Sequence, residues 1–172
     1  MKKSLLFLFL MLISSSAANA FYFEDDFDGI QLGYRGFTDL SYTFGVHHSF
    51  DRVGIMTSHG YQFAPQLFAG AGVGFNYDYN NSNCGLPVFA HFRCDILENE
   101  ITPYVDLRVG YSFLDIKGFY LNPSVGCRFE LNDNLGLNVG IGYSLQMMNY
   151  SPWYYHEKEN CGGIDLRVGI DF

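Results

Sequence analysis

The feature that most constrains this chain is a period-two alternation of apolar and other residues that runs from Tyr34 to the C-terminus. Such alternation is typical of β-strands whose two faces meet different environments. Polar, turn-like clusters interrupt it at intervals, and no helical pattern of any length accompanies it. The chain therefore predicts an all-β protein with eight strands, which are expected at residues 34–46, 52–63, 67–79, 88–96, 105–113, 119–130, 135–148 and 164–172.

Charge is sorted strictly between the two faces of these predicted strands. One face has no Asp, Glu, Lys or Arg at any position, and is filled by residues such as Leu137, Val139 and Ile141. The other face holds all six arginines of the chain with seven carboxylates, and no lysine. The charged residues of that face are Arg35, Asp39, Arg52, Asp78, Arg93, Asp95, Asp106, Arg108, Arg128, Glu130, Asp165, Arg167 and Asp171.

Two arrangements can accommodate such faces, and they differ in which face is outside. A soluble barrel or sandwich would bury the apolar face, but its polar exterior would then lack lysine, and the apolar face is too large for so small an interior. Arginine is instead favoured in enclosed, forked ion pairs with carboxylates. Charged residues are only 16% of the chain, against about 25% in typical soluble domains. We therefore expect the apolar face to meet lipid and the charged face to line a closed barrel.

The aromatic residues support this membrane-facing interpretation, because they gather near the strand ends, where membrane interfaces favour amphipathic rings. The strands also have the length that a tilted transmembrane strand requires. The aromatic residues expected at the ends next to the loops are Tyr42, Phe44, Tyr77, Tyr79, Tyr111, Phe113, Phe119 and Tyr143. Those expected at the ends next to the turns are Tyr34, Tyr61, Phe63, Tyr104, Phe129 and Phe172.

The last ten residues, Gly163 to Phe172, alternate apolar residues and finish on phenylalanine. They resemble the assembly signal of outer-membrane β-barrel proteins, and segments 70–75 and 104–111 resemble small eight-stranded barrels of the OmpA/OmpX type. The resemblance implies an eight-stranded antiparallel up-and-down transmembrane β-barrel in the bacterial outer membrane. It also implies contact with outer-membrane lipid and with the barrel-assembly machinery, Phe172 being part of the signal. It implies no particular activity, because this fold carries pores, adhesins, lipid enzymes and anchors.

The N-terminal residues have the order of a secretory signal: Lys2 and Lys3, then a short apolar run, then small residues ending at Ala20. We expect residues 1–20 to be a cleaved signal peptide, residues 21–33 a periplasmic segment and residues 34–172 the barrel. The formal net charge of −8 argues against a nucleic-acid partner.

The charged face predicts a lumen plugged by ion pairs, because eight strands leave only enough room for side chains. The expected network comprises Arg35, Asp39, Arg52, Arg93, Asp95, Asp106, Arg108, Arg128, Glu130, Asp165 and Arg167. His91 lies among them and is expected to be a network member rather than a catalytic base. The predicted function is structural or surface-interacting, in a monomer without cofactor, metal or enzymatic activity. A narrow porin-like channel is the alternative, and a lipid A-modifying enzyme is favoured less.

The cysteines and the last loop leave two questions open. Cys94 and Cys127 fall on the apolar face of strands that are not adjacent, so we expect them to be unpaired. Cys84 and Cys161 are expected in loops at one mouth, where a disulfide between them is one alternative and free thiols the other. Trp153, Tyr154 and Tyr155 give the last loop an aromatic surface that suits either an extracellular ligand, of unknown identity, or packing at the membrane interface.

Overall fold

The computed structural model describes residues 33–46, 51–96, 101–132, 135–148 and 159–172. No helix with the length and hydropathy to cross a membrane occurs among these residues. The eight strands are β1 (Gly33–Val46), β2 (Arg52–Ala64), β3 (Leu67–Asp78), β4 (Asn83–Asp95), β5 (Ile101–Leu114), β6 (Gly118–Asn132), β7 (Leu135–Met148) and β8 (Glu159–Asp171).

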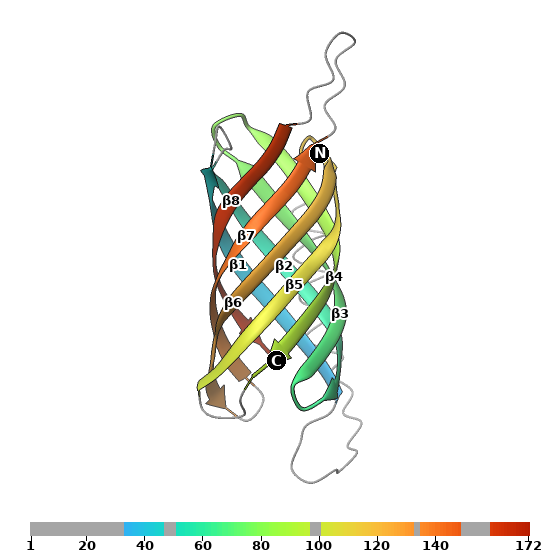
Figure 1. The fold of residues 1–172 in the computed structure, drawn as a ribbon, viewed down its shortest axis with the longest axis vertical. Coiled ribbons are helices and arrows are strands. Elements are labelled where there is room, and N and C mark those ends of the chain that lie inside the picture. The colour runs from blue at the N-terminus through green and yellow to red at the C-terminus, as the bar shows by residue number, and fades with distance from the viewer. Residues whose placement is uncertain (1–32, 47–50, 97–100, 133–134, 149–158) are drawn as a thin grey trace, which may run out of the picture.

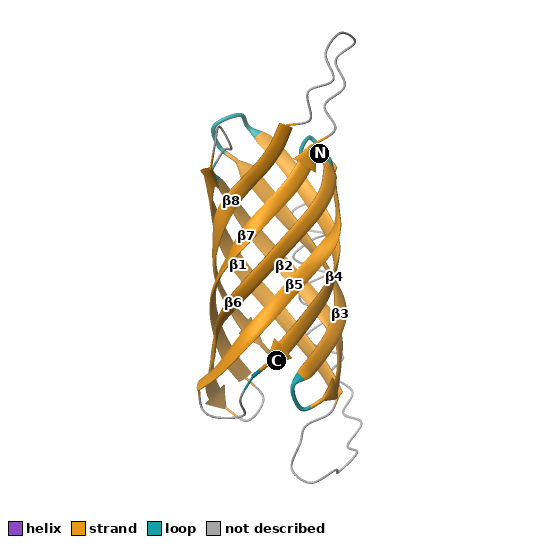
Figure 2. Ribbon diagram, in the orientation of Figure 1, coloured by secondary structure: helices purple, strands orange, loops and turns teal. Residues whose placement is uncertain are grey.

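The strands form one closed barrel in which each strand pairs with its neighbours in sequence and β1 pairs with β8. Every pairing is antiparallel, and the strands cross the wall at a steep tilt (Figures 1 and 2). The predicted fold class, an eight-stranded antiparallel up-and-down barrel, is therefore confirmed. We call the end where β1 begins and β8 finishes the terminal end, and the opposite end the loop end.

The last residue of the chain completes the seam between β1 and β8 at the terminal end. The backbone N–H of Gly36 donates to the carbonyl of Phe172 at 2.7 Å, and the N–H of Phe172 donates to the carbonyl of Gly36 at 3.0 Å. Gly36 is needed here, since a Cβ at this position would lie 2.6 Å from the Phe172 ring. The seam is thus closed by backbone hydrogen bonds to its final peptide group.

The two faces of the wall are occupied as the alternation predicts. Along β1, Phe37 and Asp39 are 1% and 2% exposed, whereas Leu40 is 64% exposed. The large apolar residues of the charge-free face point outward all round the barrel, including Val139 and Ile141 of β7. The inner surface is therefore polar and buried, and the outer surface is apolar.

Three strands begin earlier than the sequence pattern predicts. β4 begins at Asn83 rather than Val88, β5 at Ile101 rather than Val105, and β8 at Glu159 rather than Ile164. Pro87 and Pro103 lie inside strands, opposite Ser112 and Cys127. Proline lacks one N–H but keeps a β-compatible φ, so each ladder continues past it where the sequence pattern predicts a break.

Candidate functional site

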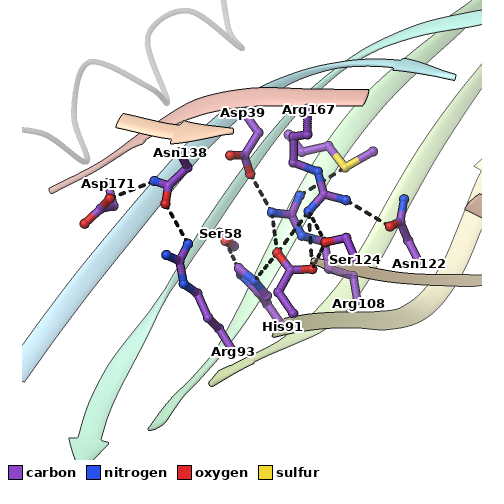
Figure 3. A network of polar contacts seen from close by, with 12 residues as sticks. Asp39, Ser58, His91, Arg93, Arg108, Asn122, Ser124, Asn138, Arg167 and Asp171 are labelled. Atoms are coloured by element: carbon purple, nitrogen blue, oxygen red, sulfur yellow. Dashed lines mark hydrogen bonds and ion pairs between the residues drawn. The ribbon is translucent and has the colours of Figure 1, made fainter. Parts of the chain in front are cut away.

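The lumen holds the functional groups that the sequence singles out, because every second residue of each strand points inward. Its side chains form three groups along the barrel axis, which we call the terminal, central and loop-end clusters. Figure 3 shows the central cluster and part of the terminal cluster. No group of three or more His, Cys, Asp or Glu residues in the described part of the chain could hold a metal ion.

The terminal cluster is built around two aspartates that are shared between arginines. Its members are Arg35, Gln62, Arg93, Asp95, Arg128, Asn138 and Asp171. Arg35 Nη1 lies 2.8 Å from Asp95 Oδ2, and its Nη2 lies 3.0 Å from Asp171 Oδ2. Arg128 Nε contacts the same Asp171 oxygen at 2.9 Å. Each carboxylate thus neutralises more than one guanidinium.

The central cluster is almost completely shielded from solvent. Its members are Asp39, Ser58, His91, Asp106, Arg108, Asn122, Ser124, Asp165 and Arg167. Arg167 Nη1 lies 2.9 Å from Asp106 Oδ2, and its Nη2 lies 3.1 Å from Asp165 Oδ2. Arg108 forms an ion pair with Asp39. Since buried charges are stable only when paired and hydrogen-bonded, this arrangement explains why both charge signs alternate here.

Ser58, His91 and Asp106 form a linear chain of hydrogen bonds inside the central cluster, which we call the inner chain. His91 Nδ1 lies 2.7 Å from Ser58 Oγ, and His91 Nε2 lies 3.2 Å from Asp106 Oδ2. An ionised carboxylate can only accept, so Nε2 carries the proton and Nδ1 accepts from the hydroxyl. The residue types match a nucleophile, a base and an acid. However, Ser58 is 1% exposed and His91 fully buried, which leaves a substrate no route to the hydroxyl.

Aromatic rings separate the guanidinium groups, which the sequence pattern did not predict. The Arg93 guanidinium lies 3.7 Å from the centroid of the Tyr104 ring and 5.0 Å from that of Phe37. Phe37 and Phe68 also pack edge-on against His91. Cation–π contacts of this kind are strongest where water is excluded. The prediction that Tyr104 belongs to the outer aromatic belt is wrong, because its ring is buried in the lumen.

Two inward-facing glycines make room for the Tyr104 ring. A Cβ on either Gly126 or Gly140 would lie 2.6 Å from the Tyr104 hydroxyl oxygen. The absence of a side chain on β6 and β7 therefore allows a large ring from β5 to fill the bore. The glycines of the inner face are part of its packing.

At the loop end, side chains from opposite sides of the wall meet over the lumen. Arg52 Nη1 donates to Gln146 Oε1 at 2.8 Å, and Gln146 Nε2 donates to the carbonyl of Ile116 at 2.9 Å. The Ile116 backbone N–H in turn donates to the carbonyl of Cys84 at 3.1 Å. Ile116 is 5% exposed. The loop-end cluster, made of Arg52, Ser112, Ile116 and Gln146, therefore lies across the mouth.

The outer surface carries one polar chain of its own, made of Tyr34, His59 and Thr57, which we call the outer chain. Thr57 Oγ1 donates to the carbonyl of Phe37 at 3.1 Å and lies 3.0 Å from His59 Nε2. Its proton is thus used, so His59 Nε2 donates and His59 Nδ1 accepts from the Tyr34 hydroxyl. This chain satisfies the imidazole without help from a lipid or a partner.

The structure brings most of the predicted network residues together, with two departures. The prediction for Glu130 is wrong, since its side chain is exposed at the end of β6, where the pairing with β7 shifts register. Its expected partner Arg128 contacts Asp171 instead. Arg52 is buried in the lumen as predicted, but it contacts an amide rather than a carboxylate.

The cysteine predictions have different outcomes. Cys94 and Cys127 are free, as expected. The alternative of a disulfide between Cys84 and Cys161 is wrong, because Cys84 is also free. Both residues lie in strands rather than loops, Cys84 in β4 and Cys161 in β8, which are on opposite sides of the ring. Trp153, Tyr154 and Tyr155, and the signal segment 1–20, lie outside the described residues.

Three solved outer-membrane barrels are similar to this chain in structure. Neisserial surface protein A matches with a TM-score of 0.60 at 14% identity, covering 81% of this chain and 95% of that one. The N-terminal barrel domain of Pseudomonas aeruginosa OprF matches with a TM-score of 0.53 at 14% identity, covering 83% and 100%. The outer membrane enzyme PagL matches with a TM-score of 0.52 at 9% identity, covering 77% and 97%.

Comparison of the sequence finds no matching family model and no matching curated protein. The structural likeness therefore concerns the fold, which is that of small outer-membrane barrels. An enzyme and surface barrels occur among the similar structures, so the fold alone does not distinguish these functions.

Proposed function

We propose that this chain is an outer-membrane barrel with a structural or surface-interaction role, and that its lumen is closed to solutes. The observation that carries the proposal is the contact of Arg108 with Asp39. These residues lie on β5 and β1, which are diametrically opposite in an eight-stranded ring. A side-chain bond between opposite walls occupies the axis of the barrel. The apolar outer surface supports the membrane location, because such a face is stable in hydrocarbon and not in water.

Recording from planar bilayers tests the closed lumen. We expect purified wild-type protein to give no steady conductance. The double substitution Asp39→Ala and Arg108→Ala removes the bond across the axis without leaving one of its charges unpaired, and it should produce small, frequent openings. Steady conductance of the wild type would support the alternative of a narrow channel for small solutes.

We also propose that the inner chain is structural and that the protein is not an enzyme. The buried position of Ser58 and the two arginines that contact Asp106 support this. A fluorophosphonate probe should therefore leave Ser58 unlabelled in the folded protein, and overproduction should leave lipid A unchanged. Labelling that disappears in Ser58→Ala but persists in the matched variant Ser144→Ala, also on the inner face, would favour a lipid-modifying enzyme.

The remaining expectations from the sequence form part of the same proposal. Export would remove residues 1–20, so intact mass of the mature protein should correspond to a chain that begins at Phe21. The mature protein would be a monomer surrounded by outer-membrane lipid, after insertion by the barrel-assembly machinery through its Phe172-terminated strand. Replacement of Trp153, Tyr154 and Tyr155 by alanine should weaken binding to any extracellular ligand without changing heat-modifiable gel mobility.

A further inference from the structure

Arg52 differs from the other arginines of the described lumen. Each of the others forms an ion pair with an aspartate, whereas Arg52 forms none. Its side chain is buried, its Nη1 donates to the neutral amide of Gln146, and its Nη2 is buried without a hydrogen-bond partner. A guanidinium charge therefore lies near the loop-end mouth with no carboxylate bound to it.

The nearest acid in the sheet does not neutralise this charge. Asp78 lies directly opposite Arg52 in the pairing of β2 with β3. Its Oδ1 instead accepts the backbone N–H groups of Asn80 and Asn81, at 2.9 and 3.4 Å, in the turn that follows β3. A buried charge without a counter-charge costs several kcal/mol. The chemistry of this site therefore favours a guest that carries negative charge.

A second polar group without a partner borders the same mouth. The Ser112 Oγ atom is buried and has no hydrogen-bond partner. A Cβ built on Gly85 would lie 3.2 Å from Ser112 Oγ and 3.4 Å from Ile116 Cβ, so the hydroxyl and the Ile116 side chain border the same space. On its other side, Ile116 accepts through its carbonyl from Gln146, the amide that Arg52 contacts. Both unpartnered groups thus lie around Ile116.

We propose that the loop-end cluster binds one small monovalent anion, of which chloride is the model, with Arg52 providing the charge and Ser112 a hydroxyl donor. The guest must accept hydrogen bonds, because the Arg52 group is only a donor. It should carry one charge, because one guanidinium lacks a counter-charge. It should be small, because both groups are buried beneath Ile116. The site requires neither a closed nor a conducting lumen, so it stands apart from the proposed function.

The test compares thermal unfolding of the full-length mature protein, folded in detergent, in sodium chloride and in sodium gluconate of equal ionic strength. Chloride at ten times its dissociation constant should favour the folded state about elevenfold. For a chain of this size that corresponds to a rise in the unfolding midpoint of about 3 °C. Gluconate is too large to enter and should give no rise.

Variants assign the effect to the site. Arg52→Gln should abolish the difference between chloride and gluconate, whatever it does to the midpoint itself. Lys117→Gln removes an exposed cation from the same loop and should keep the full difference. If Arg52→Gln does not fold, Ser112→Ala serves instead and should reduce the difference by at least half. Equal midpoints of the wild type in the two salts, or a chloride effect that persists in Arg52→Gln, would overturn the proposal.

Discussion

The inner chain and the outer chain lie on opposite sides of the same wall, and their members Ser58 and His59 are consecutive residues of β2. Both chains hold an imidazole in the same way, with Nδ1 accepting from a hydroxyl and Nε2 donating. They differ in the final acceptor. The inner chain ends on the carboxylate of Asp106, which two arginines neutralise. The outer chain ends on a backbone carbonyl.

This difference shows what each environment permits. Inside the barrel, a charge is stable because opposite charges from other strands reach it. On the outer surface no other side chain can supply a counter-charge, so a polar group persists only when its protons and lone pairs are used locally by neutral partners. The same residue type is therefore tolerated on both faces for separate reasons.

The largest expected effect breaks the inner chain at its charged end. Asp106→Ala removes an acceptor that Arg108, Arg167, His91 and Ser124 share. We expect a loss of about 3–5 kcal/mol in the free energy of unfolding, because buried cations lose part of their compensation. Urea unfolding in lipid vesicles measures it. A loss below about 1 kcal/mol would show that Asp39 and Asp165 suffice.

A charge placed on the outer surface tests the other side of the comparison. Leu40 points outward between Asp39 and Ser41, which are buried inside. Leu40→Arg should destabilise the folded protein in vesicles by about 2–4 kcal/mol, the cost of arginine on the lipid face near the membrane centre. Leu40→Ala is the matched control for lost side-chain volume. If Leu40→Arg were no worse than this control in vesicles, the outer surface would not be in hydrocarbon.

Breaking the outer chain should cost less than breaking the inner one. Thr57→Val leaves the Nε2–H of His59 without an acceptor but creates no unpaired charge. We expect a loss of about 1–2 kcal/mol in the free energy of unfolding. The cycle made with Tyr34→Phe should show coupling of at least about 0.5 kcal/mol between the two hydroxyls. Additive effects of the two substitutions would mean that the chain does not act as a unit.

The smallest effect is expected at the rim. Glu130→Gln changes a charge that the sequence pattern placed in the network but that is exposed in the structure. Its effect on the free energy of unfolding should stay within about 0.5 kcal/mol, as for most surface substitutions. Asp171→Asn, which changes a buried charge at the same end of the barrel, is the matched comparison and should cost more. Equal losses would place Glu130 in the network after all.

The sequence predicts the faces of the barrel much better than the partners within it. Alternation alone assigns Asp39 and Arg108 to the inner side and Leu40 to the outer side, because neighbouring residues of a strand point in opposite directions. Which carboxylate meets which arginine depends on the stagger of the closed sheet, and alternation carries no information about stagger. Arg128 accordingly contacts Asp171 on β8 rather than Glu130 on its own strand.

The residues missed by the sequence analysis have the same explanation. Tyr104 has the inward parity of Asp106 and Arg108, yet aromatic residues near strand ends predict an outer belt, and that general preference misled the assignment. The signal that could have corrected it was the strand that actually extends past Pro103 to Ile101. Gln146 and Ser112 are uncharged, so a search for ion pairs passes over them.

The bond between Arg108 and Asp39 has a consequence for how the protein assembles. It joins residues 69 positions apart in the chain, and it can form only after the first and last strands have met. Until then each of these groups must stay hydrated, so neutralisation of the interior rewards completion of the ring and does not guide the earlier hairpins. Expulsion of water from the bore is thereby the final event of folding, and a barrel arrested before closure would be wet, expanded and open to proteolysis.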